Sequence, residues 1–438
     1  MGGKRVNVDS KFQLKKCAKR YKYHVGGDWI SRLPDAILVG ILSSLPLKEA
    51  ARTSILSSRW VNLWKHTLHL NFDAHSALDK ITKHHGETQI LTVERRKYIN
   101  WVNKVLLFHK GLALKEVRIC FDLDNSSAKR AINHWLQFVF ERRVERLELD
   151  LSVDGDWGRS LKVCTFPIKK FMHHQARFDF RSHKALCLKS VDVTDQDVDF
   201  FLRSCPLLEH LVVHDALKIS NLNICGALAL KHLELCYCLH VKSIKVSATK
   251  LTSLKVTSVE ALLLENVPKL VEVYVCCGRE DVYVQNLVPA LYCYLSQLEI
   301  LTLELRIPMK TIEEFRFPVL ARLKKLEIYC AANGDQSMIG LTSFLRAAPY
   351  IQEFVMKCKK TSKNPDRGPK FVVAADLVAA DLKKNAKKSS RLSGLHKKLF
   401  KGPTGSEAGV VKRAAIQIHP PSGRFQGLLN IATAVHYS

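Results

Sequence analysis

The sequence predicts an α/β protein in which a small three-helix unit precedes an irregular solenoid of repeated short strands, with basic, disordered ends. Three observations lead to this prediction. Apolar residues recur at helical spacing between residues 28 and 66, and a short aliphatic pattern recurs between residues 114 and 357. The terminal segments 1–27 and 358–438 are basic and show no sustained apolar periodicity. Residues 67–113 then connect the helices to the repeats.

The first helix is predicted to begin at Pro34 and to end before Pro46. Pro34 suits the first turn of a helix, where its missing N–H group costs no hydrogen bond, and Asp35 lies at the positive end of the helix dipole. The apolar residues that follow recur every three or four positions and form one wide stripe. They are Ile37, Leu38, Ile41, Leu42 and Leu45. A second short helix is predicted over residues 48–56.

A third helix is predicted after the serines at 57 and 58, which are suitable N-cap residues. It carries Trp60, Leu63 and Trp64 on one face. A unit this small, near the roughly 40 residues below which domains usually need help to fold, is expected to cover its apolar groups with something else.

The order of these elements resembles the F-box of plant proteins. The resemblance is carried by Leu33-Pro34, Ile37-Leu38, Ile41-Leu42, Leu45 to Ala50, Ser57 to Trp60 and Leu63-Trp64. In that family the helices bind the adaptor that joins substrate receptors to a cullin–RING ubiquitin ligase. The resemblance implies an adaptor-binding set of Leu33, Pro34, Ile37, Leu38, Ile41, Leu42, Leu45, Pro46, Trp60, Leu63 and Trp64. The alternative, a helical corner of a larger domain, explains the periodicity but not the order of the elements.

The connecting segment, residues 67–113, is predicted to hold one strand and one helix. Residues 67–72 alternate between polar and apolar, which is typical of a strand. Residues 98–109 have helical spacing, and Gly111 marks the end of this helix.

From residue 114 onward the pattern L-x-x-L-x-L recurs with aliphatic substitutions. Its instances are Leu114-Val117-Ile119, Val144-Leu147-Leu149, Leu188-Val191-Val193, Leu208-Leu211-Val213, Leu230-Leu233-Leu235, Leu251-Leu254-Val256, Leu270-Val273-Val275, Leu298-Leu301-Leu303, Leu323-Leu326-Ile328 and Ile351-Phe354-Met356. From Val191 onward the middle residues lie 19 to 28 positions apart, close to the roughly 20 to 29 of leucine-rich repeats. Such a strand buries its apolar face only when neighbouring repeats stack into a solenoid. An unrelated α/β sheet is the alternative.

Two phrases extend the family resemblance into the repeats. SCPLLEHL at 204–211 and AAPYIQEF at 347–354 resemble phrases of plant F-box proteins with leucine-rich repeats. Those proteins often end in a so-called FBD region. After Lys357 this sequence departs from the family, because basic and Gly/Pro-containing segments replace the aliphatic strands. The FBD region therefore stays an open question at this point.

The residues between the inner positions of each strand point outward and are candidates for binding a target. The candidate residues are His210, His214, His232, Glu234, Lys255, Lys325, Glu327 and Tyr329. They are mixed in charge, and a merely solvated face is the alternative for each.

The net charge of +27 is concentrated in the two ends. Residues 1–27 carry +7 and residues 357–438 carry +13, which leaves little for the body of the chain. This distribution argues against a folded nucleic-acid groove. The first segment is predicted to be a flexible arm. The tail from 358 is predicted to be disordered, or to reflect an aberrant end of the gene model; binding to anionic partners is the alternative.

No catalytic or cofactor motif is found in the sequence. The patterns GxxxxGK[ST], GxGxxG, HExxH and GxSxG are absent, so a non-catalytic chain without a cofactor is predicted.

The 13 cysteines include no CxxC pair, which favours reduced thiols in an intracellular protein. Cys236-x-Cys238-x-His240 lies within a strand pattern, and no metal site is predicted. No apolar run is long enough for a membrane helix, and the nucleus or the cytosol is the expected location.

These expectations combine into one function. The sequence predicts the substrate-recognition subunit of an SCF-type ubiquitin ligase, which binds the adaptor, and through it the cullin, by its F-box and an unknown target protein by its repeats. The alternative is a nucleic-acid-binding protein, or a scaffold outside a ligase, that uses the basic ends and the repeat surface.

Overall fold

The computed structural model describes residues 30, 32–74, 88–112, 114–123, 125–152, 164–173, 178, 180–257, 262–276, 284–305, 317–332, 346–360, 413–419 and 431–432. The predicted arm, residues 1–27, lies outside the described residues, as does most of the predicted tail.

The N-terminal unit consists of short helices that begin directly after prolines. Pro34 and Pro46 are the N-caps of α1 (Asp35–Ser43) and α2 (Leu47–Arg52). A 3-10 turn, η1 (Thr53–Ile55), follows α2, so the predicted second helix is shorter than expected. The unit ends with α3 (Trp60–Leu63) and a second 3-10 turn, η2 (Trp64–His66). Its own small core consists of Leu38, Leu42, Ala50, Trp60 and Leu63.

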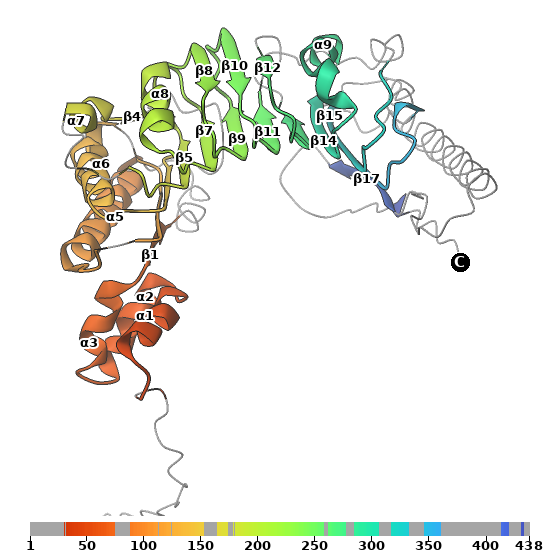
Figure 1. The fold of residues 1–438 in the computed structure, drawn as a ribbon. Coiled ribbons are helices and arrows are strands. Elements are labelled where there is room, and N and C mark those ends of the chain that lie inside the picture. The colour runs from red at the N-terminus through yellow and green to blue at the C-terminus, as the bar shows by residue number, and fades with distance from the viewer. Residues whose placement is uncertain are drawn as a thin grey trace, which may run out of the picture.

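The rest of the described chain is built on a long parallel sheet of short strands (Figure 1). Its order is β1-β2-β3-β5-β7-β9-β11-β13-β14-β15-β16-β17-β18, and only the last pair is antiparallel. The bounds are β1 (His69–Asp73), β2 (Glu116–Cys120), β3 (Arg146–Asp150), β5 (Ala185–Lys189), β7 (His210–His214), β9 (His232–Cys236), β11 (Ser253–Val256), β13 (Glu272–Val275), β14 (Ile300–Leu305), β15 (Lys325–Ala332), β16 (Glu353–Lys360), β17 (Arg413–His419) and β18 (Ile431–Ala432). Figure 1 shows these strands side by side in a curved row, with the helical unit next to β1.

The long sheet forms one side of the repeats, and helices and two smaller sheets form the opposite side (Figure 1). The helices are α5 (Thr88–Phe108), α6 (Asn125–Phe140), α7 (Ile168–His173), α8 (Asp195–Ser204) and α9 (Val284–Leu295). The smaller sheets pair β4 (Cys164–Thr165) with β6 (Val191–Asp192), and β8 (Asn221–Cys225), β10 (Ser243–Ser247) and β12 (Leu262–Glu265) with one another. None of the helices in the described ranges combines the length and apolar content needed to span a membrane.

The register of the long sheet explains why the aliphatic pattern recurs. In each parallel pair the middle residue of one repeat lies beside the middle residue of the next, as Leu211, Leu233 and Leu254 do in β7, β9 and β11. These residues are almost fully buried. Each repeat thus continues one apolar column through the molecule. The predicted α/β fold of a helical unit followed by a repeat solenoid is confirmed.

One predicted repeat is in the wrong frame. The pattern Leu188-Val191-Val193 places a strand around Val191, but the sheet strand is β5, whose buried residues are Leu186 and Leu188. The position that holds an aliphatic residue in the other repeats is taken here by His183, which is buried. A search for aliphatic residues alone therefore shifts this repeat toward Val191, which lies in the small sheet.

The sheet also extends beyond the residues assigned to the repeats from the sequence. Strand β1 belongs to the connecting segment 67–113 and pairs with β2. Strands β17 and β18 belong to the segment assigned to the tail, and β17 pairs in parallel with β16. The sequence analysis did not identify β8, β10 and β12.

The helical unit is joined to the sheet by a cluster of polar contacts. Lys65 O accepts hydrogen bonds from the backbone N–H groups of Lys110 and Gly111, with donor–acceptor distances of 2.8 and 3.3 Å. The buried ring of His109 bonds through Nε2 to Thr67 O at 3.0 Å. Burial lowers the pKa of His109, and the ring is therefore neutral near pH 7. The end of α5 thus holds the chain where the helical unit meets β1.

We expect Gly111→Ala to destabilise this junction and Gly40→Ala to stabilise the chain slightly. A Cβ at Gly111 would lie 2.7 Å from Cε1 of His109, so the ring must move away from its partner. A Cβ at Gly40, in α1, meets nothing within 4 Å. We expect a loss on the order of 1–3 kcal/mol at 111 and a gain of about 0.5–1 kcal/mol at 40. Denaturant unfolding of the full chain measures both, and equal midpoints for the two variants would contradict this account of the junction.

Candidate interaction surfaces

One face of α1 leaves its apolar side chains in solvent. Ile37 and Ile41 of α1 and Leu45, two residues beyond its end, recur every four residues and are about half exposed. Large aliphatic residues at this spacing normally cover a core, yet the core of the unit lies on the other side of the helix. The exposed face is therefore available to a partner.

The adaptor-binding set predicted from the sequence divides into two groups. Leu38, Leu42, Trp60 and Leu63 are buried in the core of the unit, so we assign them to its stability rather than to a contact with a partner. Ile37, Ile41, Leu45, Pro34 and Pro46 are exposed, and Leu33 and Trp64 are half-buried against the core. The apolar stripe predicted from the sequence thus includes two faces of α1, one buried in the core of the unit and one exposed.

Further exposed apolar residues of the unit lie outside the set predicted from the sequence, and two of them are the most exposed. Ile55, in η1, is 88% exposed, and Leu56 follows it with 62% exposure. Both belong to the second helix predicted over residues 48–56, where Ile55 counted as an apolar position of that helix, and neither was assigned to adaptor binding. The early end of α2 at Arg52 turns them outward. We name the exposed residues Ile37, Ile41, Leu45, Ile55 and Leu56 the apolar patch.

Arg59 fixes the start of α1. Its guanidinium bonds to Oδ1 of Asp35 at 2.6 Å and also donates to the backbone oxygen of Leu33. These bonds hold the residue before α3 against the first turn of α1. The contact between Arg59 and the segment Leu33 to Asp35 therefore explains why the sequence Leu-Pro-Asp is followed later by Ser-Ser-Arg-Trp.

The second surface is formed by the outward residues of the strands, and we name it the strand face. His210 and His232 lie beside each other in register, and their rings stack with centroids 4.3 Å apart and planes at 10°. Burial and the neighbouring His232 lower the pKa of His210, which favours its neutral form. Lys325, Glu327 and Tyr329 form another group on β15.

A charged ladder crosses the first strands of this face. Arg118 pairs with Asp73 at 3.3 Å and with Glu148 at 2.7 Å. Lys189 pairs with Glu148 at 3.0 Å and with Asp150 at 3.2 Å. Opposite charges therefore alternate from β1 to β5 and neutralise one another. No local pattern in the sequence reveals this ladder, because the paired residues lie about 30 or more positions apart.

A second polar group lies on β7, β9 and β11. His214 Nε2 lies 3.1 Å from Oε2 of Glu234, and Lys255 Nζ lies 3.6 Å from the same oxygen. Lys255 also covers the ring of Tyr274, whose hydroxyl donates to Glu304. Burial would raise the pKa of Glu234, but the hydrogen bond from His214 and the charge of Lys255 lower it overall, so the carboxylate is ionised. The structure thus brings His214, Glu234 and Lys255 together, although His214 is buried rather than exposed.

Comparison with known proteins identifies the family. Residues 105–373 match a family model described as At1g61320/AtMIF1, LRR domain, and residues 30–69 match the F-box domain. The first match alone covers more than half of the chain. This chain is an F-box protein with leucine-rich repeats.

Several Arabidopsis thaliana proteins are related to this F-box protein. The FBD-associated F-box protein At3g52670 is 29% identical over 266 residues, which cover 57% of this chain and 60% of that protein. The F-box/LRR-repeat protein At3g03360 is 28% identical over 236 residues, with coverage of 50% and 45%. The FBD-associated F-box protein At5g22730 is 27% identical over 207 residues, with coverage of 44% and 40%. The chain therefore spans about half the length of the curated relatives it matches.

We expect Lys189→Met to destabilise this F-box protein far more than Lys184→Met. The substitution at 189 leaves the buried carboxylate of Asp150 without its cation, whereas Lys184 pairs with Glu145 at a solvated site. The expected losses are on the order of 2 kcal/mol for Lys189 and less than about 0.5 kcal/mol for Lys184. Denaturant midpoints at low and high salt measure them. Equal small losses would show that the ladder contributes no stability.

Proposed function

We propose that this chain is the substrate-recognition subunit of an SCF-type cullin–RING ubiquitin ligase. The observation that carries the proposal is the apolar patch, which lies on an F-box unit that already has a core of its own. A unit with a complete core and a second, exposed apolar face is built to bind a partner. For an F-box that partner is the SCF adaptor, which connects the chain to a cullin.

The repeats supply the other half of this role. The strand face is a continuous polar surface, and its charges are largely paired with one another within the described residues. Such a surface suits a protein target that offers its own mixture of polar and apolar groups better than it suits a polyanion. The residues proposed for target binding are His210, His232, Lys255, Lys325, Glu327 and Tyr329, together with His214 and Glu234.

The chain acts by positioning in this proposal. It holds a target lysine near the charged ubiquitin carrier and so raises the effective concentration, while the catalytic groups belong to other subunits. The polar contacts at Lys65 and His109 support this role, because they join the F-box firmly to the first strands. The nucleus or the cytosol is the proposed site of action.

Co-purification with the SCF adaptor of a plant tests the proposal. The full chain is expected to form a stoichiometric complex that survives gel filtration. A chain that folds, as judged by circular dichroism, but elutes apart from the adaptor would overturn the ligase assignment.

A further inference from the structure

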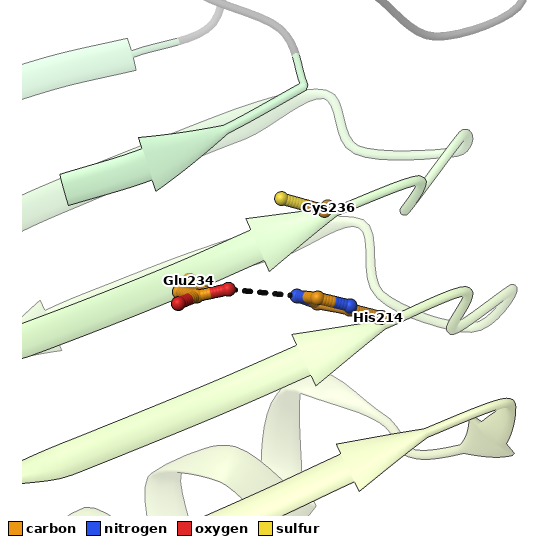
Figure 2. A group of neighbouring side chains, drawn as sticks. All are labelled: His214, Glu234 and Cys236. Carbon is orange, nitrogen blue, oxygen red and sulfur yellow. Dashed lines mark hydrogen bonds and ion pairs between the residues drawn. The ribbon is translucent and has the colours of Figure 1, made fainter. Parts of the chain in front are cut away.

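Three potential metal ligands of different chemistry meet where β7 and β9 end. A ring nitrogen of His214, a carboxylate oxygen of Glu234 and the sulfur of Cys236 all lie within 4.8 Å of one another. Figure 2 shows that the carboxylate of Glu234 and the ring of His214 point toward each other, and that Cys236 lies further along the same strand as Glu234. The sequence analysis predicted no metal site and considered Cys236 only together with Cys238 and His240.

The fold holds these side chains in place before any ligand arrives. His214 and Cys236 are partners in the parallel register, and Glu234 precedes Cys236 by two residues, so it lies on the same face of the sheet. Asp215 and Tyr237, which follow His214 and Cys236, both have positive φ, so the two strands end in the same type of turn. The side chains of His214 and Cys236 are buried and have little freedom to move away.

The chemistry of the three groups fits a zinc-class ion. Imidazole nitrogen, carboxylate oxygen and thiolate sulfur are the ligands that zinc takes in proteins, at about 2.0 to 2.3 Å from the metal. We propose that His214, Glu234 and Cys236 bind one zinc-class divalent ion on the strand face. Ligands of a tetrahedral site lie about 3 to 4 Å apart, so the widest separation must shorten by about 1 Å. Glu234 is partly exposed, and rotation of its side chain supplies this change.

A second thiol lies beside Cys236, on the residue that follows β13. The sulfur of Cys276 lies 3.3 Å from that of Cys236, but Cys276 does not belong to the group of ligand atoms that lie within 4.8 Å of one another. Both cysteines are free thiols, because their sulfur atoms lie well beyond the roughly 2.05 Å of a disulfide bond. The ion would thus tie β7 to β9 on the face proposed for target binding, although the metal proposal does not depend on the ligase assignment.

Lys255 sets a limit on the affinity of this site. Its ammonium group lies 3.6 Å from the carboxylate oxygen that would bind the metal, and the two cations repel each other. Removing this charge should therefore strengthen metal binding. A structural ion pair without a metal site predicts no such gain.

Titration of the full chain with Co²⁺ alone, under reducing conditions, tests the proposal. The thiolate-to-cobalt charge-transfer band reports sulfur ligation, and competition with Zn²⁺ gives the affinity for zinc. We expect Glu234→Gln and Cys236→Ser each to weaken metal binding more than about 100-fold. Even mutation of a residue that only hydrogen-bonds to a metal ligand typically lowers metal affinity about 10- to 100-fold. Lys255→Met should tighten binding about tenfold. Cys225→Ser, which removes an exposed thiol elsewhere, is the matched control and should change nothing.

Two results would overturn the proposal. The first is an unchanged band and affinity in both Glu234→Gln and Cys236→Ser. The second is a band that depends on cysteines but not on Glu234, because this would place the metal at other thiols of the chain. Glu234 is partly solvated, so Glu234→Gln keeps the test decisive even where Cys236→Ser fails to fold.

Discussion

Replacing Ile37 and Ile41 by aspartate is expected to abolish adaptor binding while the chain stays folded. Both side chains lie on the exposed face of α1 and make no part of the core of the F-box unit. Two apolar anchors at the centre of an interface contribute about 2 kcal/mol or more each, so the loss in affinity should exceed about 100-fold. Isothermal titration with the purified adaptor measures this loss.

Leu263→Asp is the matched control for this experiment. Leu263 lies on β12, far along the chain from the F-box, and its side chain has the same 52% exposure as that of Ile37. The control should bind the adaptor with unchanged affinity. A second comparison uses Leu38→Ala, which is expected to cost about 2–5 kcal/mol of stability because Leu38 lies in the core. Adaptor binding that survives in the Ile37/Ile41 double variant would show that the contact lies elsewhere on the unit.

Phe140→Ala is expected to cause the largest loss of stability in the repeats. Phe140 is fully buried at the end of α6, and its ring packs at 4.8 Å from that of Phe171 and 4.9 Å from that of Phe180. Removing it opens a cavity between aromatic rings from several elements. Such a truncation typically lowers the free energy of unfolding by about 3–5 kcal/mol.

Phe108→Ala removes the same number of atoms from an exposed site. The side chain of Phe108 is 52% exposed at the end of α5, so its removal should cost less than about 1 kcal/mol. Denaturant unfolding followed by intrinsic fluorescence compares the two variants. A loss at 140 no larger than that at 108 would mean that the aromatic cluster does not anchor this end of the solenoid.

Local sequence patterns predicted the structure correctly where a residue type has the same role in every element, such as proline at a helix start or an aliphatic residue inside a strand. The starts of α1 and α2 follow from their N-caps, Pro34 and Pro46, and the N-cap of α8 is Thr194, whose side chain forms a capping box with Asp197. The columns of buried aliphatic residues follow from their period of two within each strand. The pattern failed at β5, because His183 is a polar residue that is buried at a position where the other repeats have an aliphatic one.

By itself, the sequence determined that an F-box unit precedes leucine-rich repeats, because the order of the helical elements and the spacing of the aliphatic residues are local properties of the chain. Only the tertiary structure decided which side of the apolar stripe on α1 is covered, because Leu38 and Ile37 are similarly apolar and only Leu38 packs into the core of the unit. It also decided that His214 meets Glu234 and Cys236, since a parallel register stacks residues about 20 positions apart. Burial and side-chain contacts between distant residues depend on how the repeats stack, and that information is not contained in any short stretch of the chain.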